Sequence, residues 1–166
     1  RNQIDDLAVS TDIIVGFPGE RDVDFEQTLE VAAEARFDNA YTSVYSPRPG
    51  TEAAELVDKF VSPAVTSTRM ERLRKVIERS IRLGNHSRIG RHEEVVVEGH
   101  SKRDADMLTG RTRHNRLVHF PVKRPIRPGS YALVQVTAAR TFNLAGELLE
   151  VTAAPKHRTR IPVVAS

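Results

Sequence analysis

Two turns of the sequence carry the residues best suited to hold a small molecule. Residues 16–20 (Gly-Phe-Pro-Gly-Glu) follow one short apolar run, and residues 45–50 (Tyr-Ser-Pro-Arg-Pro-Gly) follow another. Gly16 and Gly19 allow the backbone to approach a ligand closely, and Phe17 can pack against a flat ring. A plain tight turn with no ligand is the alternative interpretation of such a segment.

Cationic residues concentrate in the second half of the chain and offer a different chemistry. Residues 1–87 contain 11 Lys or Arg against 15 Asp or Glu, whereas residues 88–166 contain 14 against 7, within an overall charge of +3. Hydroxyl and amide side chains lie among these cations, and that mixture suits contacts with phosphates and some bases of a folded RNA. A solvated basic surface is the alternative. The candidate RNA-binding residues are Lys102, Arg103, Arg111, Arg113, Asn115, Arg116, Lys123 and Arg124.

Aromatic residues are few in this basic half. We expect Phe120, Tyr131 and Phe142 to lie in the core. Contacts to the RNA backbone are therefore favoured over base stacking. The cations of 102–103 are expected to extend the same face as those of 111–116.

Several classes of function are excluded or disfavoured by composition. The chain has no cysteine, so it can form no disulfide and no thiolate metal site, and its six histidines show no ligand spacing. It has no nucleotide-binding glycine motif, no serine-hydrolase motif and no apolar run of about 20 residues. With 28% charged and 39% hydrophobic residues, it is typical of a globular protein. We expect a cytoplasmic location and no membrane partner.

The first turn is positioned by a βαβ unit. An apolar run at 13–15 predicts a buried strand, the periodicity of 24–36 predicts a helix capped by Asp24, and 40–45 is rich in β-branched and aromatic residues. Two strands are too few for a stable parallel sheet. We therefore expect the rest of that sheet to precede Arg1 or to come from another chain.

The remainder divides into a linker and a small barrel. A short helix is predicted at 52–59 and a long charged helix at 63–83, ending near Gly84. Short apolar runs at 94–98, 116–120, 131–136 and 147–151 predict an all-β barrel. The expected fold is thus α/β plus all-β, with a partial barrel segment at 1–62, a linker helix at 63–87 and a β-barrel at 88–166.

The motifs together resemble a known family. Residues 11–20 (Thr-Asp-Ile-Ile-Val-Gly-Phe-Pro-Gly-Glu) and 37–51 resemble the fifth and sixth strands of the open (β/α)₆ barrel of the radical S-adenosylmethionine methylthiotransferases. Residues 99–103, 108–120 and 144–148 resemble that family's C-terminal TRAM domain, a small RNA-binding β-barrel. The resemblance covers nearly the whole chain in the correct order. It is strongest to the tRNA-modifying branch, which adds a methylthio group to isopentenyladenosine beside the anticodon.

The resemblance implies cofactors that this chain alone cannot hold. The family uses S-adenosylmethionine and two [4Fe–4S] clusters bound by cysteines, which this chain lacks. It matches only the C-terminal portion of such an enzyme, so the missing N-terminal portion is an expected partner and the chain alone is expected to be inactive. The residues implied to line the adenosylmethionine pocket are Val15, Gly16, Phe17, Tyr45 and Ser46.

The implied partner is the anticodon stem-loop of tRNA, and two alternatives stay open. One is a stand-alone, non-catalytic RNA-binding module. The other is a ribosomal-protein methylthiotransferase, whose TRAM domain binds protein. Arg48 and Pro49 argue against the ribosomal-protein methylthiotransferase, because that branch usually carries acidic residues at this loop.

Overall fold

The computed structural model describes residues 3–121 and 124–155. These residues form two compact units, divided between Gly84 and Asn85. Within the described part of the chain, no helix is both long and apolar enough to cross a membrane. The expected α/β plus all-β fold is confirmed, since the first unit is α/β and the second is a β-barrel.

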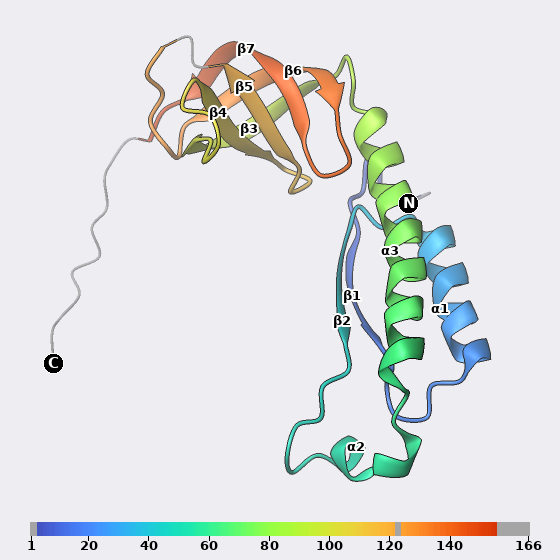
Figure 1. The fold of residues 1–166 in the computed structure, drawn as a ribbon. Helices are drawn as coiled ribbons and strands as arrows, with labels where there is room; N and C mark the ends of the chain where they lie inside the picture. The colour runs from blue at the N-terminus through green and yellow to red at the C-terminus, as the bar shows by residue number, and fades with distance from the viewer. Residues whose placement is uncertain (1–2, 122–123, 156–166) are drawn as a thin grey trace, which may run out of the picture. The chain divides into compact units, whose positions relative to one another are not determined.

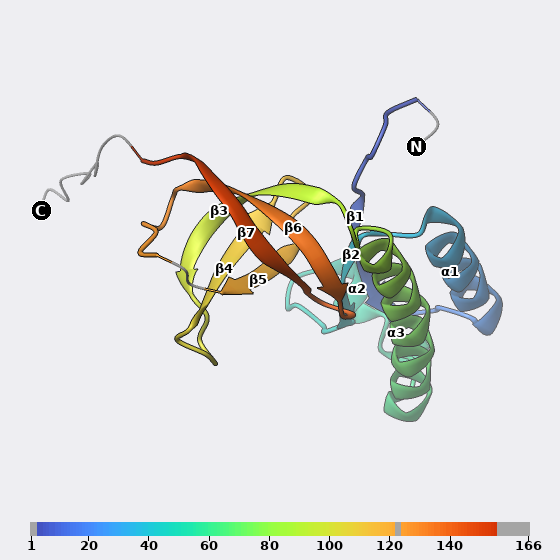
Figure 2. The same ribbon diagram turned by 90° about the horizontal axis from the view of Figure 1, so that it is seen from above.

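The first unit is a βαβ segment followed by helices. Its strands β1 and β2 pair in parallel, with Ser10 opposite Asn39 and Val15 opposite Val44. The helices α1 and α3 lie on the same side of this strand pair (Figures 1 and 2). The elements are β1 (Ser10–Val15), α1 (Asp22–Ala35), β2 (Asn39–Val44), α2 (Glu52–Glu55), the 3₁₀ helix η1 (Val57–Lys59) and α3 (Pro63–His86).

One face of the strand pair is packed and the other is open. The packed face and the two helices bury a core of Val15, Phe25, Ala32, Leu73, Ile77 and Ile81. On the opposite face, Ile14 is 55% exposed and Tyr41 is 61% exposed. Each strand also has one edge that pairs with no other strand among the described residues. The incomplete parallel sheet predicted from the sequence is therefore observed.

Helix boundaries differ from the predicted ones in three places. Helix α1 begins at Asp22, so the N-cap residue is Arg21 and Asp24 is the third helical residue, whose carboxylate accepts a hydrogen bond from the Arg21 amide (2.9 Å). The predicted helix at 52–59 is broken at Leu56, whose φ and ψ of −78° and 47° are not helical. Helix α3 continues beyond residue 83 to His86.

The second unit is a closed barrel in the order β3-β4-β5-β7-β6. All neighbouring strands are antiparallel except β5 and β7, which are parallel. Alternate residues point inward, and the core includes Val97, Leu108, Phe120 and Val134. The strands are β3 (His92–His100), β4 (Met107–Thr112), β5 (Leu117–Pro121), β6 (Tyr131–Ala139) and β7 (Leu144–Ala153).

Strand β4 is absent from the predicted elements. Its outward residues are polar or half-buried, and its centre is Gly110, so it lacks the apolar run that marks the other strands. The glycine is required by packing, because a Cβ there would lie 2.7 Å from Val95 Cγ2. Close packing against Val95 therefore explains the glycine at this position, and the glycine weakens the strand signal in the sequence.

Candidate functional site

The two turns predicted to hold a small molecule meet at the carboxyl ends of β1 and β2. The Tyr45 amide donates to the Val15 carbonyl (2.9 Å), which joins the two strand ends. The ring of Phe17 meets Tyr45 edge-on with centroids 5.2 Å apart, and Tyr45 meets Phe60 at 6.0 Å. Carboxyl ends of parallel strands are where α/β folds place their ligands. The structure thus brings Gly16, Phe17 and Tyr45 together at one rim.

The first turn is held by a buried ion pair that sequence reasoning missed. Arg69 of α3 donates to Glu20 Oε2 (2.7 Å) and to Asp22 Oδ1 (2.6 Å), and only 6% of its side chain is exposed. The same Glu20 oxygen accepts the Gly16 amide (2.7 Å). Burial lowers the pKa of Arg69, but hydrogen bonds to Asp22 and Glu20 outweigh this effect and raise it above its ordinary value. The two partners lie 49 residues apart in the chain, so local patterns give no signal for the pair.

The predicted pocket residues differ in what they expose. Phe17 is 49% exposed and Ser46 is also exposed, so both side chains can meet a ligand. The side chain of Val15 is fully buried in the core, so only its backbone reaches the rim. The Gly16 amide is already bonded to Glu20, so this glycine offers a ligand close approach but no free donor.

A cavity of about 470 Å³ opens beside this rim. Its lining includes Gly16 and Tyr45 from the strand ends, Phe60 from the loop, and Met70 and Arg74 from α3. Apolar walls with one cation at the edge suit a planar, partly charged molecule.

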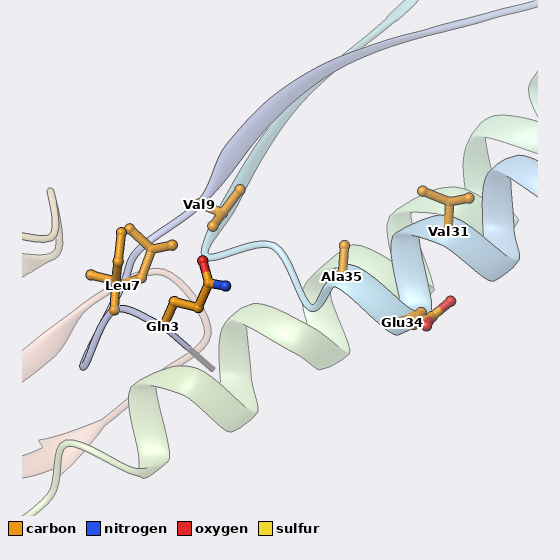
Figure 3. Close-up of a pocket in the computed structure, with 7 residues that line it drawn as sticks. Gln3, Leu7, Val9, Val31, Glu34 and Ala35 are labelled. Carbon is orange, nitrogen blue, oxygen red and sulfur yellow. The ribbon is translucent and has the colours of Figure 1, made fainter. Parts of the chain in front are cut away.

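A larger hollow lies at the opposite end of the strands. It measures about 830 Å³ and is lined by the N-terminal segment and the last turns of α1, including Leu7, Val9 and Val31 (Figure 3). Val9 directly precedes β1, so this hollow is at the amino ends of the parallel strands. Because ligands bind at the carboxyl ends in such sheets, we do not assign it to the predicted pocket.

The candidate RNA-binding residues occupy two separate ends of the barrel. The pairing of Met107 with Pro121 puts the β3–β4 loop (101–106) and the described part of the β5–β6 loop (124–130) at one end. The β4–β5 turn (113–116) and the β6–β7 hairpin tip (140–143) lie at the other end (Figure 1). Strand β4 has six residues, so the two ends are about 17 Å apart along it. The predicted cations thus lie at both ends of the barrel, and the expectation that 102–103 extend the face of 111–116 stays a prediction.

The first end carries Lys102, Arg103 and Arg124, all exposed. Lys123 lies outside the described residues. The 101–106 loop also contains Asp104 and Asp106, which reduce its net positive charge.

The β4–β5 turn exposes some of its predicted residues and buries others. Arg113 and Asn115 are exposed, whereas Arg116 is only 7% exposed and donates to the Asn85 side chain. Asn115 adopts φ of 61°, which closes the tight turn. Thr112 is buried and its hydroxyl accepts the Arg116 amide (3.1 Å). Arg113 and Asn115 are thus available to a ligand, and the Arg116 side chain is part of the interior.

Arg111 lies on the barrel wall in an ion pair. It donates to Glu98 Oε1 (2.6 Å) and to Asn115 Oδ1 (3.1 Å), and 38% of its side chain is exposed. A phosphate would have to compete with Glu98 for this guanidinium. The effective positive charge of Arg111 is therefore smaller than the sequence suggests.

Two of the three aromatic residues expected in the core are exposed. Phe120 is fully buried, but Tyr131 is 44% exposed and Phe142 is 64% exposed. Tyr131 follows the strand alternation in which Ala132 and Val134 point inward, and Phe142 lies at a hairpin tip. The alternation and the polar Arg140-Thr-Phe-Asn143 segment are signals that could have indicated exposure.

Comparison with known proteins identifies the second unit. The model of the TRAM domain family matches residues 86–149. Residues 86–149 are a TRAM domain. The five-stranded barrel that exposes Arg113 and Phe142 is therefore the fold of this TRAM domain in the chain.

The similarity extends beyond the TRAM domain. The tRNA-2-methylthio-N(6)-dimethylallyladenosine synthase of Moorella thermoacetica is 44% identical over 153 residues, which are 90% of this chain and 33% of that protein. Proteins of the same name from Thermoanaerobacter sp. (strain X514) and Kineococcus radiotolerans are 45% identical over 91% and 96% of this chain, and the matches cover 32% of each. The resemblance to tRNA methylthiotransferases is confirmed. The chain spans about a third of the length of these curated relatives.

Proposed function

We propose that the chain is the C-terminal part of an enzyme that adds a methylthio group to N6-dimethylallyladenosine of tRNA, with the TRAM domain binding the tRNA. The observation that carries this proposal is the identity of 45% over 96% of the chain to a protein of that name. The incomplete sheet supports it, since an open face and open strand edges are typical of part of a larger barrel.

The proposed enzyme requires iron–sulfur clusters and S-adenosylmethionine, and the residues of this chain suit only the second of these groups. The chain has no cysteine, and no cluster of metal-ligating side chains occurs among the described residues, so the residues here do not fit an iron–sulfur cluster. The rim at the ends of β1 and β2 does fit a small molecule with a flat ring, because Phe17 is exposed beside Gly16 and Tyr45. There Phe17, Tyr45 and Ser46 would hold S-adenosylmethionine, the methyl donor.

The TRAM domain would bind the tRNA backbone through its exposed cations. Arg113 has no hydrogen-bond or ion-pair partner among the residues that the structure describes, and Lys102, Arg103 and Arg124 are exposed at the other end of the barrel. Cations of this kind bind phosphates by electrostatic attraction and counterion release. The anticodon stem-loop is the proposed contact because the modified base lies beside the anticodon.

A competition experiment tests this assignment. Labelled tRNA bound to the chain is challenged with an unlabelled anticodon stem-loop or, as the matched control, an acceptor-stem hairpin of the same length. We expect the anticodon stem-loop to displace the tRNA at lower concentration. Equal displacement by both hairpins would contradict the proposed contact, and no binding of tRNA would contradict the proposed role of the TRAM domain.

A further inference from the structure

The β4–β5 turn and the β6–β7 hairpin tip are fixed beside each other by one buried side chain. Asn85 donates from Nδ2 to the carbonyls of Arg140 (2.9 Å) and Thr141 (2.8 Å). Its Oδ1 accepts a hydrogen bond from Arg116 at the end of the β4–β5 turn. Asn85 is only 3% exposed, so these bonds are shielded from water. The two loops therefore form one structured end of the barrel, which we call the Asn85 end.

The hairpin holds Phe142 at its tip. The Arg140 amide donates to the Asn143 carbonyl (2.8 Å), so Thr141 and Phe142 are the two central residues of a tight turn. The Phe142 ring is 64% exposed although the backbone that carries it is fixed on both sides. An exposed ring on a fixed backbone binds with little loss of conformational entropy.

The surroundings of this ring are cationic. Residues 85–92, 113–116 and 137–143 lie at the Asn85 end, and these segments contain no Asp or Glu. Arg113 and Arg140 are exposed, and neither has a side-chain partner among the described residues. The acidic residue that follows these loops most closely, Glu93, is buried and pairs with Arg88 (3.1 Å). The Asn85 end thus carries an exposed aromatic ring, that of Phe142, on a positively charged surface.

We propose that the Asn85 end is a nucleotide-binding site in which Phe142 stacks on an unpaired base and Arg113 and Arg140 bind the flanking phosphates. The proposal deepens the proposed tRNA-binding function and rests on it. Stacking on an aromatic ring accepts any base, and the arginines supply the charge that single-stranded RNA requires. A nucleic acid is favoured over a protein partner because residues 85–92, 113–116 and 137–143 carry cations and no Asp or Glu.

Substitutions at Phe142 separate stacking from simple apolar contact. Phe142→Leu keeps an apolar side chain but removes the ring, and Phe142→Trp keeps a ring. With a hairpin RNA that has unpaired loop bases, we expect Phe142→Leu to weaken binding about 5- to 150-fold and Phe142→Trp to retain it. With a blunt duplex of the stem sequence, we expect wild type and both variants to bind alike. Equal binding of the hairpin by Phe142→Leu and wild type would overturn the proposal.

A spectroscopic readout tests contact directly. The chain has no tryptophan, so Phe142→Trp introduces a single reporter. We expect its fluorescence to be quenched by the hairpin RNA and not by the duplex. Unquenched emission at saturating hairpin RNA would overturn the proposed stacking. Binding of the same RNA is followed separately by anisotropy of labelled RNA. If the RNA binds without quenching the tryptophan, the proposed function stands and the stacking site fails. If wild type binds neither RNA, the proposed function and this inference both fail.

Discussion

The Asn85 carboxamide accepts a hydrogen bond from the Arg116 guanidinium inside the second unit, where both side chains are buried. Arg116 is one of the cations that the sequence assigns to RNA contact. Its burial means that it supports the β4–β5 turn from within, while Arg113 and Asn115 face solvent. The proposed RNA surface is therefore narrower than the run of cations suggests.

Replacing Asn85 tests its role as the support of two loops. Asn85→Ala removes two donors to backbone carbonyls and the acceptor for Arg116, leaving buried polar groups without partners. We expect the free energy of unfolding to fall by about 2–3 kcal/mol. Urea unfolding followed by circular dichroism measures it. The control is His86→Ala, which changes an exposed neighbouring residue. If Asn85→Ala lowers the free energy of unfolding no more than His86→Ala does, the hydrogen bonds of Asn85 are not required for stability.

Arg113 and Arg116 are expected to respond differently to the same substitution. Arg113→Ala changes an exposed residue, so it should weaken RNA binding and change stability by no more than about 0.5 kcal/mol. Arg116→Ala leaves the buried Asn85 oxygen unsatisfied and should cost about 1–3 kcal/mol. Unfolding curves and RNA titrations of both variants provide the comparison. A destabilised Arg113→Ala, or an unchanged Arg116→Ala, would contradict this division.

The architecture was largely predictable because it depends on local patterns. Strands such as β1 and β6 have apolar runs, and α3 has helical periodicity with a proline at its start. Strand β4 could not be found in this way, because it has no apolar run and its centre is Gly110, where a Cβ would meet Val95 and Phe120 of other strands.

The candidate site was predictable in its residue types and less so in its geometry. The two turns after β1 and β2 could be placed at one rim, since carboxyl ends of parallel strands meet. Burial of Arg116 and the pairing of Arg69 with Glu20 depend on partners that are distant in the chain. Exposure of Phe142 depends on its position in a hairpin, which residue type alone does not show.

Gly16 is required at the first turn for two separate reasons. Its φ of 79° strains any residue with a Cβ, and that Cβ would lie 2.9 Å from Thr66 Oγ1. Gly50 has φ of 83° with nothing within 4 Å, so Gly50→Ala measures strain alone. We expect Gly50→Ala to cost about 1 kcal/mol and Gly16→Ala to cost more. Urea unfolding followed at the helical circular dichroism band tests this, and equal losses would exclude a contribution from Thr66.

The Arg21–Asp24 pair at the start of α1 predicts an acid-side pH dependence. Hydrogen bonds from the Arg21 side chain and backbone lower the pKa of Asp24 from 3.8 to about 2. Because the folded-state pKa is lowered, the contribution of this group to stability is complete above the unfolded value of about 3.9 and is lost as pH falls toward 2. NMR titration of the Asp24 carboxyl gives its pKa directly. Arg21→Ala should return that pKa toward 3.8, and an unchanged value would contradict the pairing.

If the TRAM domain binds tRNA through phosphate contacts, as proposed, its affinity for RNA must fall as the salt concentration rises. The measurement is the dissociation constant of the chain for an anticodon stem-loop over a series of salt concentrations. We predict a linear log–log plot whose slope rises by about 0.7–0.9 for each phosphate contact, and a smaller slope for Arg113→Ala. A slope near zero, or the same slope for Arg113→Ala and wild type, would contradict phosphate binding at this end of the barrel.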